Sequence, residues 1–324
     1  MNKKALIFSL LLALLSAFGA YWTIREQNVE TDNSSVGSLF FEETAKDGLS
    51  INKIIVKMPQ MQATLYLDGK FWRIKEADDY YAGLITINGL FNAINEAKIL
   101  SVVKQKITSD MQLAYPENKE TPAAGISIQT FNKNGVKVDD VIIGANQDGH
   151  YYARYANLDT PMLISGNFAL PDRLHYWLQQ PLMMLSEKSV ETVIMQSETG
   201  QQLAFRQDAT SPFYNLQQQE TNISAFLEQF SSLGFVSVKA SENTPLADEL
   251  PKKAIVIFLE SGLIYGVEVY ENEDSYWVRI NLSTTSLPTK LASDYIKDSS
   301  FLYKNWFFKI DSSIGKFLVQ YIIH

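Results

Sequence analysis

The first 24 residues place the strongest constraint on this chain. Two lysines precede a run from Ala5 to Ile24 that contains no charged side chain. At 1.5 Å of rise per residue, these roughly 20 positions make a helix about 30 Å long, the thickness of the hydrocarbon core of a bilayer. Tyr21 and Trp22, near its end, are residue types enriched at membrane interfaces. The sequence therefore predicts a cytoplasmic tip and a transmembrane anchor over residues 1–24, in contact with the lipid bilayer.

The charges on either side of this run predict its orientation. Lys3 and Lys4 precede it, whereas Arg25 is followed at once by Glu26. Because basic residues stay on the cytoplasmic side of an inserted helix, the large C-terminal part is expected in the periplasm or otherwise outside the cytoplasm. The predicted location is the inner, cytoplasmic membrane, which the chain crosses once.

A cleaved secretory signal is the alternative interpretation of the same segment. Ala17, Gly19 and Ala20 are small enough to form a cleavage site. The apolar run is longer than the usual signal core of about 7–15 residues, and this length favours an uncleaved anchor. A lipoprotein is excluded because the chain has no cysteine to carry a lipid.

Composition limits the partners and the chemistry of the remaining chain. The formal net charge is −8, so that a polyanion would be repelled, and we expect no nucleic-acid partner. Hydrophobic residues make up 46% and aromatic residues 12% of the chain, which indicates a folded protein with a sizeable core. Because cysteine is absent, the protein has no disulfides, thiolate nucleophiles or thiolate metal sites.

The pattern after the anchor divides into a tether and two domains. Residues 25–50 are polar and rich in serine and asparagine, which is typical of a flexible tether. Residues 51–187 and 188–324 each combine β-branched runs, glycine-containing turns and an amphipathic helix. The predicted fold class is α+β, with the transmembrane helix followed by two similar units. Each unit is expected to be an antiparallel β meander of hairpins with a packed helix.

Local signals indicate turns and helices within each unit. Asp68-Gly69, between two extended segments, predicts a type I′ hairpin turn with positive φ at both positions. The Asp78-Asp79 pair is expected to cap a helix over residues 84–97. In the second unit, apolar residues at helical spacing predict a helix over residues 223–233 that ends at Gly234.

The two halves contain similar motifs in the same order. Tyr276-Trp277-Val278-Arg279 resembles Tyr151-Tyr152-Ala153-Arg154, about 125 residues earlier, and Trp306 stands where Trp177 stood. These matches suggest a duplicated unit with small insertions. Two independent domains of the same class are the alternative, because strand–helix–strand order is common.

The sequence offers no catalytic constellation, and we expect a non-enzymatic protein without cofactor or metal. The histidines His150, His175 and His324 have no second histidine or carboxylate at ligand spacing, and we interpret them as surface or structural residues. A nucleophile elbow, a P-loop and a dinucleotide-binding motif are all missing from the sequence.

Aromatic and arginine residues in the repeated strands are the candidates for an interaction surface. Tyr152 and Arg154 in the first half, and Tyr276 and Arg279 in the second, are of types enriched at binding hot spots. The competing interpretation is that the strand aromatics pack a sheet against its helix and that both arginines face solvent.

A series of motifs runs in a fixed order from about residue 49 to residue 197. They are Asp68-Gly69-Lys70-Phe71-Trp72 with Ile74, Tyr115-Pro116, the strand from Asp140 to Gly144, the segment from Tyr152 to Arg154, and Trp177 ahead of Pro181-Leu182. Together they resemble a bacterial family known as the domain of unknown function 4340. The second half of the chain resembles this family only loosely.

That resemblance implies a function. Members are often encoded beside an ABC transport system of the gliding-motility type, which implies a non-catalytic periplasmic accessory or scaffold protein that contacts permease and auxiliary membrane subunits. An alternative is a periplasmic protein that binds or senses a small ligand between its two domains, because domain junctions favour pockets. An extracytoplasmic hydrolase is a third interpretation, and the missing nucleophile–base pairs count against it.

Overall fold

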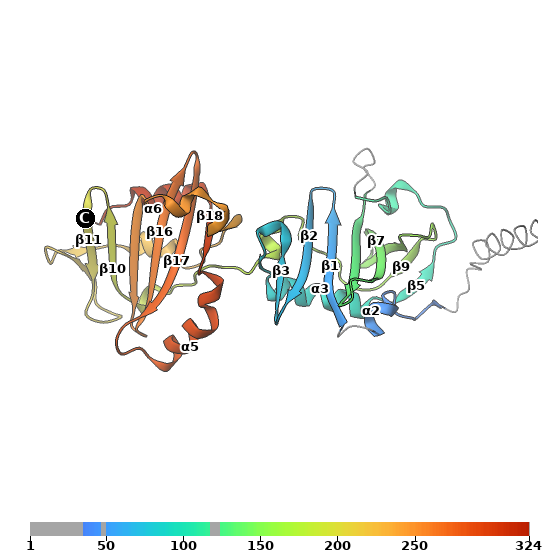
Figure 1. Cartoon of the computed structure of the whole chain (residues 1–324), viewed down its shortest axis with the longest axis horizontal. Coiled ribbons are helices and arrows are strands. Elements are labelled where there is room, and N and C mark those ends of the chain that lie inside the picture. The colour runs from blue at the N-terminus through green and yellow to red at the C-terminus, as the bar shows by residue number, and fades with distance from the viewer. Residues whose placement is uncertain (1–34, 47–49, 117–123, 324) are drawn as a thin grey trace, which may run out of the picture.

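Two similar units lie end to end in the protein, each built on an antiparallel sheet of nine strands (Figure 1). The structure, a computed structural model, describes residues 35–46, 50–116 and 124–323. The mixed α+β class and the two similar units are thereby confirmed. The predicted anchor, with Ala5, Tyr21, Trp22 and Ile24, lies outside the described residues.

None of the helices in the described part of the chain has both the length and the apolar character needed to cross a membrane.

The first sheet contains strands β1 to β9. Their bounds are β1 (Ile51–Met58), β2 (Met61–Asp68), β3 (Phe71–Ile74), β4 (Tyr80–Tyr81), β5 (Ile99–Val102), β6 (Ile126–Asn132), β7 (Lys137–Gln147), β8 (His150–Tyr155) and β9 (Met162–Ile164). The order across the sheet is β4-β3-β2-β1-β6-β7-β8-β9-β5, so that β4 and β5 form its two edges.

The second sheet contains strands β10 to β18. Their bounds are β10 (Val190–Ser197), β11 (Gly200–Phe205), β12 (Phe213–Asn215), β13 (Glu220–Thr221), β14 (Ser237–Ala240), β15 (Lys253–Leu259), β16 (Leu263–Asn272), β17 (Ser275–Thr284) and β18 (Trp306–Ile310). The order is β13-β12-β11-β10-β15-β16-β17-β18-β14. Every strand therefore has a counterpart at the same place in the first sheet, and the edges are β13 and β14.

The strand register extends this correspondence to individual residues. Ala153 pairs with Met162 across β8 and β9, and Val278 pairs with Phe308 across β17 and β18. Because Arg154 and Arg279 each follow these residues, they occupy equivalent positions. Independent folding of two unrelated units would not explain such agreement in both strand order and register, and duplication is the simpler interpretation.

The predicted equivalence of the two tryptophans is wrong. Trp306 begins β18, the counterpart of β9, whereas Trp177 ends the short helix η5 (Leu174–Trp177), which follows β9. The reason is an insertion in the second unit, because helix α5 (Lys290–Ser299) lies between β17 and β18. Their similar sequence spacing therefore matched two tryptophans that lie in different elements of the fold.

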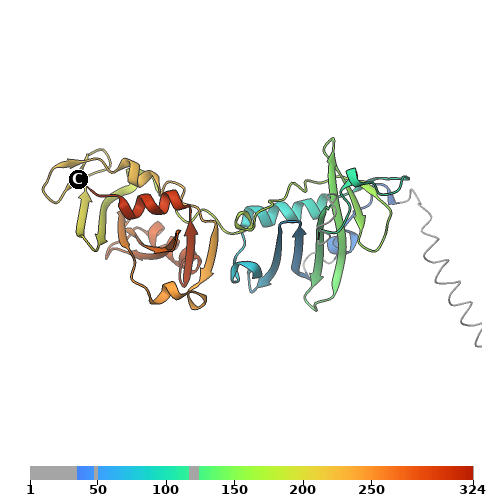
Figure 2. The same ribbon diagram turned by 90° about the horizontal axis from the view of Figure 1, so that it is seen from above.

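One long helix covers the first sheet, but its start differs from the prediction. Helix α3 (Leu84–Glu96) lies along one face of the sheet, with Ile87, Leu90 and Ile94 buried (Figure 2). Its N-cap is Gly83, without a side-chain cap. The Asp78-Asp79 pair instead adopts left-handed backbone conformations ahead of β4, so the predicted cap is wrong. The chain forms β4 before it enters the helix.

The second unit has shorter helices than predicted. Helix α4 (Ser224–Glu228) ends well before Gly234, although Phe230 and Leu233 are fully buried. Residues 179–184, which we call the connector, pair with the backbone where the last helical turns were predicted. Leu233 N donates to Met183 O (3.0 Å), and Leu182 N donates to Leu233 O (2.7 Å). Most of the helical cover comes from α6 (Ser312–Gln320), near the C-terminal end (Figure 2).

The hairpin predicted at Asp68-Gly69 is present, but its turn type is not the predicted one. Asp68 pairs with Phe71 as the last residue of β2, so Gly69 and Lys70 form the loop. Of these residues only Gly69 has a positive φ, at 62°. Glycine alone at the first loop position is characteristic of a type II′ turn, which matches the strand twist equally well.

Part of the predicted tether belongs to the first unit. Phe40 and Phe41 are fully buried, and the Tyr155 ring stacks on Phe40 with centroids 4.9 Å apart. The short helix α2 (Glu42–Lys46) follows, where Thr44 N and Thr44 Oγ1 both donate to Asp139 Oδ2. Aromatic burial therefore fixes residues 35–46 on the core, although their polar neighbours gave the segment the composition of a linker.

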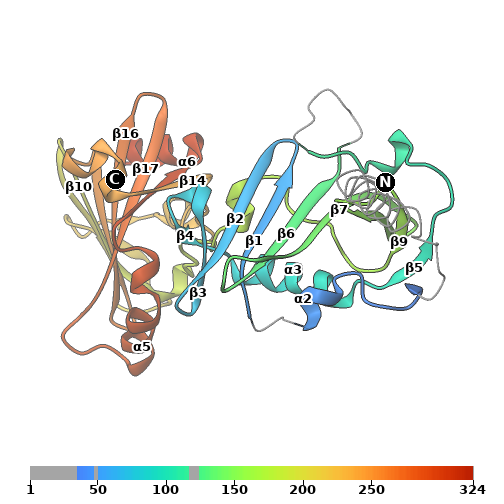
Figure 3. The same ribbon diagram turned by 45° about the vertical axis from the view of Figure 1, so that its right-hand side comes forward.

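The two units share a packed aromatic junction. Edge strand β4 of the first sheet lies against edge strand β14 of the second, as Figure 3 shows. Tyr80, 1% exposed, makes edge-to-face contacts with Phe235, Trp306 and Phe308 at centroid distances of 5.1–5.7 Å. Phe301 of the second unit also packs against Phe71 and Tyr81 of the first; their centroids lie 4.6 and 4.8 Å away. A single apolar core thus runs through both units.

Candidate functional site

Arg154, predicted as part of an interaction surface or as a solvated side chain, is buried. Only 6% of the residue is exposed, and its Nε donates to Leu113 O at 3.0 Å. Its Nη1 lies within hydrogen-bonding distance of the carbonyls of Tyr155, Ala156 and Leu158, at 3.0–3.3 Å. The guanidinium therefore ties two loops to the end of β8, and both predicted placements of Arg154 at the surface are wrong.

Arg279 has a different role at the equivalent position. Across the sheet, Arg154 faces Ile142, whereas Arg279 faces Glu268. Arg279 Nε lies 2.6 Å from Glu268 Oε2, and this hydrogen bond raises the pKa of Arg279. About a third of the Arg279 side chain is exposed, so it forms a surface ion pair. The two repeated arginines thus differ both in the residue that faces them and in the loop carbonyls that only Arg154 contacts.

The four predicted surface residues do not form one surface. Tyr152 packs with Met111, Leu113 and Ile142 in a small apolar cluster on the outer face of the first sheet. Its counterpart Trp277 packs in the same way with three other residues of the second unit, Leu246, Tyr270 and Phe307. These clusters are covered by η4 (Ser109–Met111) and η8 (Pro245–Asp248), one in each unit.

Tyr276 lies on the opposite face of its strand, against helix α6. A Cβ atom built on Gly315 of that helix would lie 2.1 Å from Tyr276 Cβ, so the backbone of α6 approaches the tyrosine directly. The Tyr276 hydroxyl donates to Glu271 Oε1 at 2.9 Å. Tyr276 thus helps to seat the helix rather than to complete a site with Arg279.

This close approach yields a prediction about stability. Gly315→Ala should lower the free energy of unfolding by about 1–3 kcal/mol, because the added methyl overpacks the contact with Tyr276. The matched control is Gly89→Ala in α3, where nothing lies within 4 Å of the new methyl, and it should stabilise by about 0.5–1 kcal/mol. Urea denaturation of both variants measures the difference. Equal effects would contradict the packing of α6 on Tyr276.

The two histidines that the structure describes lie in different elements, and His324 lies outside the described residues. His150 begins β8 at a hairpin, and His175 lies in η5 beside Tyr176. Burial lowers the pKa of His175, and the nearby charge of Arg173 lowers it further. Within the described ranges, no cluster of three or more His, Asp or Glu side chains is arranged to hold a metal ion.

An open groove beside the connector carries the most distinctive surface chemistry. It has a volume of about 540 Å³ and lies between connector residues 179–184 and the second unit. None of its lining residues is charged, and we call it the connector groove. They are Gln179, Gln180, Pro181, Leu182, Met183, Met184, Ser261, Leu263, Tyr265, Leu291, Ala292, Tyr295, Ser299, Leu302 and Tyr303.

The rim of the connector groove exposes large apolar side chains. Met184 is 74% and Leu291 is 77% exposed, and both line the groove. On the first unit, Leu84 and Ile85 at the start of α3 are 66% and 89% exposed. Leu84 N donates to Oε1 of the groove residue Gln179 (3.4 Å), so these apolar residues adjoin the groove. Exposed large apolar side chains gathered around a groove are a feature of contact sites.

A chain of three tyrosine hydroxyls fixes one wall of this groove. Tyr303 Oη donates to Leu182 O at 2.8 Å, and its other hydrogen bond is with Tyr295 Oη at 3.1 Å. Tyr265 Oη donates to Tyr295 Oη at 3.3 Å, so the donors all run toward the connector. Burial raises the pKa values of Tyr265 and Tyr303, and these phenols stay neutral. The hydroxyl groups of this wall are therefore already hydrogen-bonded within the protein.

A second cavity of about 540 Å³ lies at the junction itself, where a ligand site between the domains was predicted. Several of its charged groups already serve the fold. Arg73 forms an ion pair with Asp68 at 2.8 Å and donates from Nη1 to Asp79 O at 2.9 Å. Asp78 Oδ2 accepts from Ala240 N across the junction at 3.2 Å. Arg73 is thus held within the first unit and Asp78 joins the two units, so these groups already have partners in the fold.

Neither a protein-family model nor a curated protein matches this chain.

Proposed function

We propose that this protein is a membrane-anchored, extracytoplasmic, non-catalytic docking or scaffold protein, an accessory component of an ABC-type transport complex. The observation that carries the docking role is the connector groove, which has no charged lining residue and an apolar rim. Removing a large apolar side chain such as Met184 or Leu291 from water contributes about 1.5–3 kcal/mol, so a partner that covers this rim gains affinity from it.

The anchor, the location and the transport partner rest on the sequence. The uncharged run over residues 5–24 supports the anchor, and the order of motifs in the first half supports the association with permease and auxiliary membrane subunits. The fold adds a reason for a scaffold role. Because Tyr80 and its aromatic neighbours lock the two units together, a partner bound at the groove contacts both units in a fixed arrangement.

The test is purification of the tagged full-length protein from its own cells in a mild detergent. We expect permease and ATPase subunits of a transporter to co-purify, and the double variant Met184→Glu/Leu291→Glu to lose them, because two buried charges oppose docking. Val136→Glu/Leu250→Glu is the matched control, since both residues are exposed and lie outside the groove. A protein that always purifies alone, or a loss that is equal in both variants, would contradict the proposal.

The same groove supports a second candidate function, the binding of a small apolar ligand. Its volume of about 540 Å³ falls within the range of about 300–1,000 Å³ that is typical of ligand sites, and its lining carries no charge to repel an apolar molecule. Native mass spectrometry of the protein after gentle extraction decides this point. A bound small molecule that is displaced by the Leu291→Glu substitution would favour a carrier or sensor over a scaffold.

A further inference from the structure

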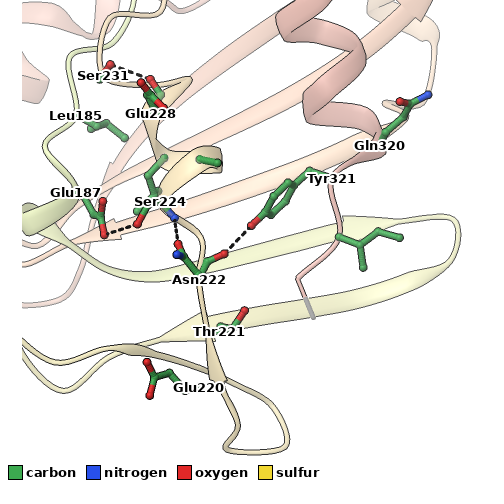
Figure 4. A pocket seen from close by; sticks show the side chains of 13 residues that line it. Leu185, Glu187, Glu220, Thr221, Asn222, Ser224, Glu228, Ser231, Gln320 and Tyr321 are labelled. Atoms are coloured by element: carbon green, nitrogen blue, oxygen red, sulfur yellow. Dashed lines mark hydrogen bonds between the residues drawn. The ribbon is translucent and has the colours of Figure 1, made fainter.

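A second groove lies at the far end of the second unit, where β13, α4 and the chain after α6 meet (Figure 4). It is open and has a volume of about 1060 Å³, larger than either the connector groove or the junction cavity. We call it the β13 groove. Its lining residues are Leu185, Glu187, Glu220, Thr221, Asn222, Ser224, Ala225, Leu227, Glu228, Ser231, Gln320, Tyr321 and Ile322.

The floor of the β13 groove is apolar and held in place. The Tyr321 ring stacks on Phe226 with centroids 4.9 Å apart, and its hydroxyl donates to Asn222 O at 3.1 Å. Leu185 and Leu227 are buried beside it. Figure 4 shows Tyr321 directed at Asn222 across the floor. The groove is thus preformed, which lowers the ordering cost of binding.

The only charged residues of the lining are carboxylates. Glu187, Glu220 and Glu228 line the groove without any lysine, arginine or histidine among the lining residues. Glu187 Oε1 accepts from Ser224 Oγ at 3.0 Å, and none of the three forms an ion pair with any residue that the structure places. A concave surface with charges of one sign concentrates ligands of the opposite sign.

The strand that borders the groove, β13, is an edge strand of the second sheet. β13 pairs only with β12, so its other edge has no strand partner within the described part of the chain. Its counterpart in the first sheet is β4, the edge strand by which the first unit contacts the second. The corresponding edge of the first unit thus contacts polypeptide through side-chain packing. An edge strand can also add an extended segment through its backbone.

We propose that the β13 groove binds an extended polypeptide segment of a partner, in which lysine or arginine alternates with apolar residues. In an extended segment, alternate side chains point to opposite sides, so the apolar ones face the Tyr321 floor while the basic ones reach the carboxylates. This proposal is independent of the connector groove, because it uses different residues and a different chemistry.

The probe is a fluorescein-labelled peptide of eight alternating leucines and lysines, measured by anisotropy with the full-length protein in detergent. We expect binding that weakens about tenfold in the triple variant Glu187→Gln/Glu220→Gln/Glu228→Gln, and that weakens in salt. The matched control is Glu191→Gln/Glu198→Gln/Glu260→Gln, which neutralises three exposed glutamates outside the groove and should leave the affinity unchanged. Circular dichroism confirms that each variant is folded.

A second variant tests the groove itself rather than the charge of the unit. Ala225→Lys places a cation on an exposed position of α4 inside the groove and should abolish binding without disturbing the core. The proposal is overturned by equal affinity in the triple variant and its control, or by equal binding of a leucine–glutamate peptide. It is also overturned if spermine binds in the same carboxylate-dependent manner while no peptide does.

Discussion

Replacing Tyr80 by alanine should lower the free energy of unfolding by about 3–5 kcal/mol, the cost of truncating a fully buried aromatic side chain. Tyr80 contacts Phe235, Trp306 and Phe308 across the junction, so the substitution removes packing from both units at once. We expect one unfolding transition to divide into two in a guanidinium titration followed by tryptophan fluorescence. Trp72 and Trp177 report on the first unit, and Trp277 and Trp306 on the second.

Tyr80→Phe is the matched control for this experiment. It keeps the ring and its four edge-to-face contacts and removes only the hydroxyl, so it should retain a single transition and lose less than about 1.5 kcal/mol. If the alanine variant also unfolds in one step with unchanged stability, the two units do not depend on this junction.

The two equivalent arginines should respond differently to the same substitution. Arg154→Met leaves buried loop carbonyls without their donor and should cost about 2–4 kcal/mol. Arg279→Met breaks one partly exposed ion pair and should cost no more than about 1 kcal/mol. Urea denaturation of both variants at constant pH provides both values.

A further pair of variants separates the effect of charge from that of geometry. Arg154→Lys keeps the positive charge but cannot reach carbonyls on two loops at once, so most of the loss should remain. Ile142→Glu would give Arg154 the facing residue that Arg279 has, and would bury an acidic group in the cluster around Met111. If Arg154→Met and Arg279→Met had equal effects, the difference in their surroundings would be without energetic consequence.

The sequence predicted the class of the fold and its two similar units because both depend on short-range patterns. β-branched runs, glycine turns and the Tyr-x-x-Arg repeat locate strands without knowledge of the tertiary structure. Helix ends were predicted less well. Leu233 has the apolar spacing of a helix, but its backbone pairs with Met183, and only the folded chain brings these two residues together. The Asp78-Asp79 pair likewise has the composition of a cap but precedes a strand.

Neither groove was predicted, because each is assembled from segments far apart in the sequence. The connector groove joins residues near 180 to residues near 265, 291 and 303, and the β13 groove joins residue 187 to residue 321. Weak signals were present in Met183-Met184 after Pro181 and in Leu291, an apolar residue in polar surroundings. The repeated arginines gave a stronger signal that proved structural, because the burial of Arg154 depends on the loop that carries Leu113.

The contact between β4 and β14 joins the two units head to tail. In the shared strand order these are opposite edges, so the contact joins unlike surfaces and leaves β5 at one end and β13 at the other. Residues 37–40 cover the outer edge of β5, whereas β13 has no strand partner on its outer side within the described part of the chain. The described chain begins beside β5, where Gly37 N donates to Ile99 O at 2.7 Å. In the arrangement that we propose, the membrane anchor and a polypeptide bound at β13 would therefore lie at opposite ends of the two units.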